Sequence, residues 1–155
     1  MGFLPHCIAL SADGGRLALG GNDAQLVLLE SVSLQPLSMR VWHLPLVDAE
    51  TNGVVQALAF SPDGQMLASV ANDDRLVVGD ARTGDPLAEA RLSVEAVQPY
   101  SRLERRVCWS ADGAQVAVTN GEGRIEIFGP RGSKRGSCPG PIMGPPAGAP
   151  GSRAT

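Results

Sequence analysis

The side chains that could do chemistry in this 155-residue chain are few and scattered. The histidines are His6 and His43, and neither is spaced from a cysteine or from the other as a metal-binding pair would be. The single lysine, Lys134, follows no Gly-x-x-x-x-Gly-Lys loop that could bind phosphate. These residues predict no bound metal and no cofactor.

The aspartates are more regular, but their pattern indicates architecture. Asp13, Asp63 and Asp112 each precede a glycine in a similar setting, where an Asp can hydrogen-bond its own backbone in a tight turn. Ser11-x-Asp13-x-Gly15 is superficially similar to the Asp box of sialidases, but the Thr-Trp of that motif does not follow. Asp73-Asp74 lacks the array of oxygen ligands that calcium requires. We therefore expect no catalytic site and no enzyme activity.

These turns belong to a sequence segment that is repeated three times. Its serines, Ser11, Ser61 and Ser110, lie 50 and 49 residues apart, and the flanking residues continue in register. The three copies read IALSADG, LAFSPDG and VCWSADG, so that Leu10, Phe60 and Trp109 occupy one slot. A period of this length, made of short apolar runs between turn residues, is typical of a propeller blade.

Each repeat divides into short strand-like runs. Three runs are separated by the Ser-x-Asp-Gly turn and by a second turn, and a fourth run follows Pro36 and Pro86 in the first two repeats. Short strands joined by tight turns lie next to each other and pair antiparallel. The sequence thus predicts an all-β protein of about three four-stranded antiparallel blades, over residues 6–44, 55–92 and 105–128. The third repeat stops at Phe128, without its fourth strand.

These residues resemble the WD40-repeat β-propellers, most closely from Leu58 to Asp80. The resemblance covers residues 6–128 and departs from the family in two places. No repeat has the Gly-His that precedes the first strand, and the Trp-Asp that ends the third strand is replaced by Leu29-Glu30, Gly79-Asp80 and Phe128-Gly129.

The resemblance implies a buried hydrogen-bonded set of His, Ser or Thr, Asp and Trp in each blade. Ser69 and Asp73 are its remnants in the second repeat and Asp23 in the first, while the third keeps none unless Glu122 substitutes. We therefore expect apolar packing between sheets to hold the blades.

Ring closure and composition bear on the ends of the repeat region. Propellers close with about four to eight blades, so three blades predict a partial propeller from a larger WD-repeat protein. Residues 129–155 hold seven Gly and six Pro and are expected to be a disordered tail.

Charge and hydropathy limit the partners. Residues 1–128 contain nine basic and all sixteen acidic residues, a net charge of −7, which offers no footprint for nucleic acid. No segment is apolar enough to cross a membrane, and none resembles a signal peptide. Cys7, Cys108 and Cys138 show no disulfide spacing, and Cys108 occupies the slot of Ala9 and Ala59. The chain is expected to be cytoplasmic, with reduced thiols.

What remains is recognition of other proteins, as the resemblance implies for the connections between blades. Candidate partner-binding residues are Trp42 and His43 at the entrance of one connection, and Tyr100, Arg102 and Arg105 in the next. Trp42 has the alternative of ending a strand and packing against the neighbouring blade. The preferred hypothesis is a non-catalytic scaffold. The alternatives are a cytoskeletal or ciliary WD-repeat array, or a propeller enzyme with its active site outside these residues.

Overall fold

The described part of the chain consists of three four-stranded antiparallel sheets. A computed structural model describes residues 2–44, 53–93, 104–120 and 122–138. The first sheet contains β1 (Pro5–Leu10), β2 (Arg16–Gly21), β3 (Gln25–Glu30) and β4 (Pro36–Val41). The second contains β5 (Val55–Phe60), β6 (Met66–Ala71), β7 (Arg75–Asp80) and β8 (Pro86–Arg91). The third contains β9 (Val107–Trp109), β10 (Val116–Thr119), β11 (Ile125–Phe128) and β12 (Lys134–Ser137).

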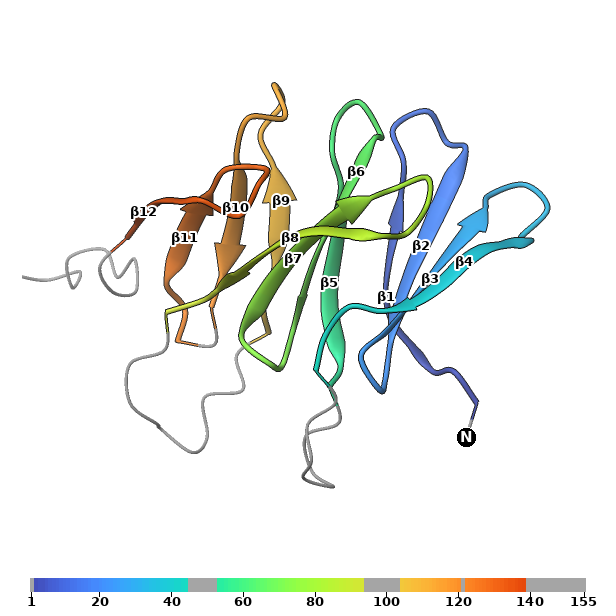
Figure 1. The fold of residues 1–155 in the computed structure, drawn as a ribbon, viewed down its shortest axis with the longest axis horizontal. Coiled ribbons are helices and arrows are strands. Elements are labelled where there is room, and N and C mark those ends of the chain that lie inside the picture. The colour runs from blue at the N-terminus through green and yellow to red at the C-terminus, as the bar shows by residue number, and fades with distance from the viewer. Residues whose placement is uncertain (1, 45–52, 94–103, 121, 139–155) are drawn as a thin grey trace, which may run out of the picture.

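The sheets are arranged as adjacent propeller blades, which confirms the expected fold class. Within each sheet the strands lie in chain order, each paired antiparallel with the next. The three sheets stand side by side, and the first strands β1, β5 and β9 are neighbours from blade to blade (Figure 1). We call the sheets blades 1, 2 and 3 in chain order.

The same turn joins the first two strands of every blade. In blade 1 the hydroxyl of Ser11 donates to Asp13 Oδ1 at 2.6 Å, and the same oxygen accepts the amide of Gly15 at 2.9 Å. Ser61 with Asp63 and Ser110 with Asp112 repeat this arrangement. The serine hydroxyl, followed by the backbone amide, lowers the pKa of each aspartate. The architectural role predicted for these aspartates is confirmed.

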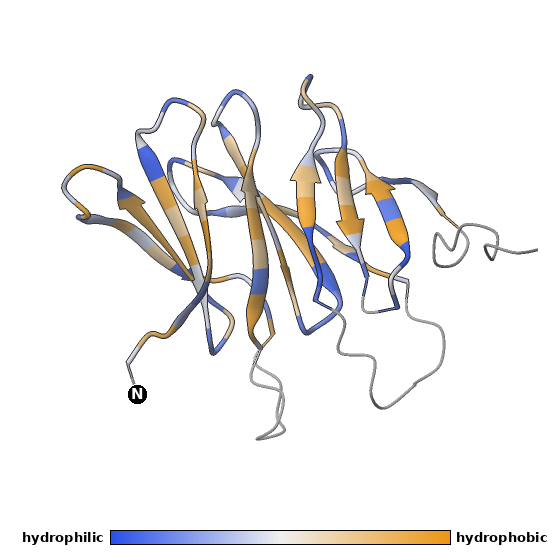
Figure 2. Ribbon diagram, turned by 180° about the vertical axis from the view of Figure 1, so that it is seen from behind, coloured by the Kyte–Doolittle hydropathy of each residue, from blue (hydrophilic) through white to orange (hydrophobic). Residues whose placement is uncertain are grey.

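Two apolar cores lie between the sheets. The first joins Ala18, Leu26 and Leu28 of blade 1 to Leu58, Leu67 and Val77 of blade 2. The second joins Ala68, Val70, Leu76 and Val78 of blade 2 to Val116, Val118 and Phe128 of blade 3. The apolar colouring of the strands in Figure 2 follows these faces. Blade 2 thus buries apolar side chains on both of its faces, which is the arrangement that the predicted packing between sheets requires.

A few polar contacts accompany each core. Across the first interface, Cys7 Sγ donates to the carbonyl of Val55 at 3.3 Å, and Arg16 donates to the carbonyl of Gly64 at 3.3 Å. Burial raises the pKa of the Cys7 thiol to about 11. Across the second interface, the indole of Trp109 donates to the carbonyl of Ala59 at 2.9 Å.

The end of the third blade corrects one expectation. Residues 129–155 were predicted to be disordered, with the fourth strand missing, but β12 pairs antiparallel with β11 within this stretch. Its residues, Lys-Arg-Gly-Ser, show no apolar alternation, so only the pairing with β11 reveals the strand. The rest of the predicted tail, residues 139–155, lies outside the described part of the structure.

Among the described residues there is no helix, and so none that could cross a membrane.

Core residues on the two interfaces should dominate stability. Leu67 is fully buried in the first core, so Leu67→Ala should lower the free energy of unfolding by about 2 to 5 kcal/mol. Leu87 lies on β8 and is 63% exposed, and Leu87→Ala should change it by no more than about 0.5 kcal/mol. Denaturant unfolding of both variants checks this ranking. Equal losses would mean that the first core is not the main packing interface.

Candidate functional site

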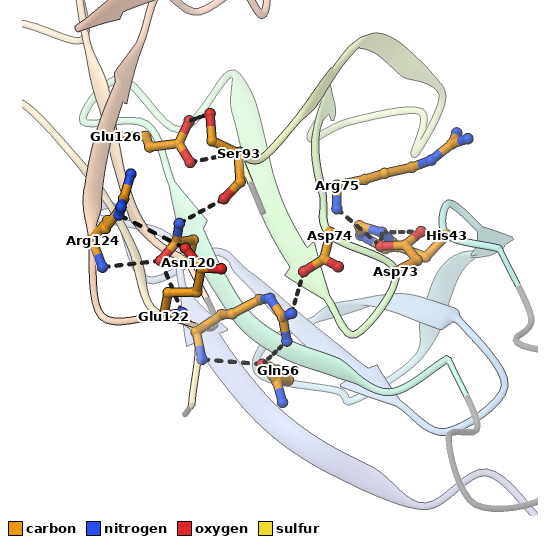
Figure 3. Close-up of polar contacts among 11 residues, drawn as sticks. His43, Gln56, Asp73, Asp74, Arg75, Ser93, Asn120, Glu122, Arg124 and Glu126 are labelled. Carbon is orange, nitrogen blue, oxygen red and sulfur yellow. Dashed lines mark hydrogen bonds and ion pairs between the residues drawn. The ribbon is translucent and has the colours of Figure 1, made fainter. Parts of the chain in front are cut away.

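The most reactive side chains of the structure meet where blade 1 passes into blade 2. His43 follows β4 and inserts into blade 2, where its Nε2 lies 2.7 Å from the hydroxyl oxygen of Ser69. Its Nδ1 lies 3.0 Å from Asp73 Oδ1 (Figure 3). His43 is 2% exposed and Ser69 is fully buried. In the neutral ring, Nδ1 donates to the carboxylate and Nε2 accepts from the hydroxyl.

Asp73 is held in its ionised form by this arrangement. Burial by itself would raise the pKa of Asp73, but the hydrogen bond from His43 opposes it. The backbone amides of Leu44 and Arg75 also donate to the carboxylate, at 3.0 and 3.2 Å. Together they hold the pKa of Asp73 below its ordinary value.

Ser69, His43 and Asp73 have the order of a hydrolytic triad, but no substrate can reach the serine. A nucleophile must lie open to the group that it attacks, and Ser69 has no exposed surface. The three residues therefore serve as a polar lock: the chain leaving blade 1 is fixed to the second strand and second turn of blade 2.

Trp42 completes this lock. Its indole N–H donates to the carbonyl of Gly84 at 2.9 Å, and its ring lies against Gly79. A Cβ at position 79 would come within 2.4 Å of that ring. The glycine that replaces the family's Trp in β7 thus makes room for a Trp supplied by the preceding blade.

Blade 3 is locked at the equivalent place with different residues. Ser93, which follows β8 as His43 follows β4, donates its amide to Glu126 Oε1 at 2.7 Å. Asn120 donates to the carbonyl of Ser93 at 2.7 Å (Figure 3). Glu126 is fully buried and pairs with Lys134 of β12 at 2.7 Å. A carboxylate on β11 and the amide of Asn120 therefore replace the His-Ser-Asp lock of blade 2.

Arg105 forms a further polar contact between blades 2 and 3. It is 9% exposed, its amide donates to Gln56 Oε1 at 3.0 Å, and its guanidinium pairs with Asp74. Arg105 precedes β9, while Gln56 and Asp74 belong to blade 2.

The structure corrects several of the predicted site residues. Trp42, His43 and Arg105 were offered as partner-binding residues, but all three are buried and occupied in contacts between blades. For Trp42 this confirms the alternative, in which it packs against the neighbouring blade. Asp23, offered as a lock remnant, is exposed and accepts a hydrogen bond from Asn22 at 3.2 Å. Tyr100 and Arg102 lie outside the described residues.

The His43 lock was missed because its histidine comes from the previous repeat. The family pattern places the histidine directly before the first strand, and here it stands twelve positions before β5 begins. The 50-residue alignment that places His43 beside Ser93 is the signal that could have suggested a shared role for the two positions. Glu122, considered as a substitute, is instead paired with Arg124, and its amide donates to Asn120.

An exposed polar surface lies nearby, where the connections enter the first strands of the blades. A hollow of about 360 Å³ is lined by His6, Val54, Gln56, Glu104 and Arg106. We call it the rim hollow. Glu104 and Arg106 are exposed and form an ion pair, and His6 at the start of β1 is also exposed. Within the described residues, no group of three or more His, Cys, Asp or Glu is placed to bind a metal ion.

Side-by-side meander blades, of which blades 2 and 3 are locked by residues from the one before, define a β-propeller protein. A family model described as the anaphase-promoting complex subunit 4 WD40 domain matches residues 33–99. Residues 33–99 are thus similar to a WD40 domain, and the repeats of this chain resemble those of WD40-repeat proteins.

Individual relatives agree with this assignment. RACK1, a small ribosomal subunit protein of Dictyostelium discoideum, is 30% identical over 94 residues, covering 54% of this chain and 28% of that protein. Protein HIR1 of Eremothecium gossypii is 29% identical over 79% of this chain and 17% of its own length. Coronin-7 of Bos taurus is 34% identical over 58% of this chain and 10% of its own length. The chain thus spans less than a third of these relatives.

A solved structure confirms the fold alone. BamB from Moraxella catarrhalis superposes with a TM-score of 0.67 at 13% sequence identity, covering 86% of this chain and 37% of that one.

The lock between blades 1 and 2 should depend on pH. Because the pKa of Asp73 is lower in the folded chain, the ionised carboxylate contributes stability above its unfolded pKa of about 3.9. This contribution is lost as the pH falls through the folded pKa. Asp73→Asn should lower the free energy of unfolding by about 1 to 3 kcal/mol at neutral pH, and the difference from wild type should shrink in acid.

Asp23→Asn is the matched control, since Asp23 holds the same place in blade 1 but is exposed. Denaturant unfolding at neutral and acid pH compares the two variants. An equal penalty for both, or a penalty for Asp73→Asn that does not change with pH, would contradict the assignment.

Proposed function

We propose that the chain is a non-catalytic scaffold that binds other proteins at the rim hollow and the adjoining connections. The observation that supports this most directly is the position of the hollow. Its lining residues lie at the starts of β1 and β5 and just before β9, and His6, Glu104 and Arg106 among them are exposed (Figure 1). Loops carried on a rigid framework are the usual place for recognition.

The proposal that the chain is not an enzyme rests on the use of its reactive groups. His43, Ser69 and Asp73 are buried in the lock, and the recurrent turn aspartates are bonded to their own turns. What lies open around the rim hollow is an Arg-Glu pair and a histidine, which suit hydrogen bonding and charge recognition.

The charge of the hollow indicates the kind of surface that it would meet. Its exposed groups include both signs, so a mixed polar protein surface fits better than a uniformly charged polymer such as nucleic acid. We propose that Tyr100 and Arg102, in the connection that leads to Glu104, extend this surface. A cytoplasmic location is part of the same proposal.

Three blades are fewer than a propeller ring requires. The scaffold therefore has to be completed by further blades, in the same larger WD-repeat polypeptide or in another one.

Exchange of exposed rim residues should weaken partner capture without unfolding the chain. Arg106→Ala, Tyr100→Ala and Arg102→Ala should each reduce affinity for captured proteins by about tenfold, the effect of a 1.4 kcal/mol contact. Their free energies of unfolding should change by about 0.5 kcal/mol or less. Affinity capture from cell extract with quantitative mass spectrometry, followed by titration of the captured protein, measures the effect.

Arg40→Ala serves as the control, because Arg40 is an exposed arginine on β4, away from the rim hollow. Capture that survives all three rim substitutions and fails with Arg40→Ala would place the binding surface elsewhere. If Tyr100→Ala unfolded the chain as Leu67→Ala does, the connection would be a core element.

A further inference from the structure

The two end blades each leave one sheet face open, and the two open faces match. We define the leading face of a blade as the one directed toward the preceding blade, and the trailing face as the one directed toward the next. In blade 2 the leading face carries Leu58, Phe60 and Leu67, packed on blade 1. The trailing face of blade 1 that receives them carries Ala18, Leu26 and Leu28.

The leading face of blade 1 presents almost the same residues to solvent. Ile8, Leu10 and Leu17 stand where blade 2 has Leu58, Phe60 and Leu67. Ile8 is 64% exposed and Leu10 is 58% exposed, whereas Leu58 is 8% exposed. The slot shared by Leu10 and Phe60 is thus half-buried in blade 2 and open in blade 1, because only blade 2 has a neighbour on this side.

The outer strand of blade 1 extends this apolar face. Met39 lies directly opposite Val27, and Val41 lies opposite Gln25, on the same side of the sheet as Ile8. Both are more than half exposed. Blade 2 has Glu89 and Arg91 at these positions, which is the chemistry of a strand that faces water. Met39 and Val41 indicate instead that the leading face of blade 1 is covered in the functional assembly.

The trailing face of blade 3 is the complementary open surface. Ala117, Ile125 and Ile127 stand where blade 1 has Ala18, Leu26 and Leu28. A shallow hollow of about 170 Å³ lies here, lined by Cys108, Ala117, Thr119, Ile125 and neighbouring residues. Cys108 is exposed because none of the three described sheets covers it, although Ala9 and Ala59 at the equivalent positions are half-buried.

We propose that a second copy of this chain docks head to tail, with the leading face of its blade 1 on the trailing face of blade 3. The proposal rests on the similarity between two trailing faces. Ala117, Ile125 and Ile127 of blade 3 correspond to the residues of blade 1 on which blade 2 packs. The contact between copies would therefore repeat an interface that already exists within the chain. Such a contact is heterologous, and it closes only if the rotation between copies allows a ring. Two copies supply six blades, within the about four to eight that close a propeller.

The contact between copies is apolar, unlike the locks within the chain. Leu19 holds the position of Ser69, which contacts His43 in the lock of blade 2. Asp23 is exposed, whereas the side chain of Asp73 at the equivalent position is buried. The strength of the contact between copies should therefore depend on buried apolar area and be insensitive to salt. This proposal does not depend on the rim hollow.

Matched charge substitutions on the two open faces test the proposal. Leu10→Glu blocks the leading face of blade 1, Cys108→Glu blocks the trailing face of blade 3, and Leu87→Glu on the middle blade is the control. All three positions are exposed, so the variants should keep the circular dichroism spectrum and thermal transition of the wild type. Sedimentation velocity over a range of concentrations, with a reducing agent to prevent disulfides through Cys108, measures association.

The wild type and Leu87→Glu should associate as concentration rises, at low and high salt alike. Leu10→Glu and Cys108→Glu should each remain monomeric alone. An equimolar mixture of the two should form a dimer and nothing larger, because it restores one intact pair of faces.

Three results would overturn the proposal. A monomeric wild type at every concentration would assign the open faces to blades of a longer polypeptide. Association of Cys108→Glu alone, with Leu10→Glu monomeric, would mean that two leading faces pair with each other. Association of the wild type that persists in both single variants would place the contact elsewhere on the chain.

Discussion

The packing of one sheet on the next is the interaction on which the rest of this structure depends. A single four-stranded meander buries little surface and has two faces to cover. Here the small side chains Ala18 and Ala68, both fully buried, let the larger residues of the following blade approach closely. The turns, the locks and the rim hollow all take their positions from this repeated contact.

The polar locks form at the edge of each apolar interface, and they hold the alignment of the blades. His43 and Ser93 both follow a fourth strand, and each can reach its partners only after the next blade has docked. Buried polar groups are costly unless every partner is in place, so the locks favour one relative position of the sheets over its neighbours. The two locks lie at equivalent positions of blades 2 and 3, but they are built from different residues.

This use of the reactive residues bears directly on function. A histidine, a serine and two carboxylates, which elsewhere could form an active site, are buried within contacts between blades. Within the part of the chain that the structure describes, the open surfaces include a polar hollow at the starts of the first strands and two apolar end faces. The chemistry of the first suits recognition of polar protein surfaces, and the shape of the others suits another blade.

The sequence by itself determined the repeat, the all-β class and the Ser-x-Asp-Gly turns. These are local features, because the turn hydrogen bonds join residues at most five positions apart, and the apolar alternation needs no knowledge of neighbours. The resemblance to WD40 repeats followed from the same local pattern. It also suggested Ser69 and Asp73 as a pair, without the histidine that joins them.

Only the tertiary structure decided the sites. His43 meets Ser69 and Asp73 across 26 and 30 positions of the chain, and Arg105 meets Gln56 across 49. Such contacts depend on how two sheets are set against each other, which no local pattern records. The strand β12 was hidden for the same reason, because its polar residues become a strand only by pairing with β11. Exposure of Leu10 and burial of His43 likewise follow from which blade has a neighbour, a property of the assembled sheets.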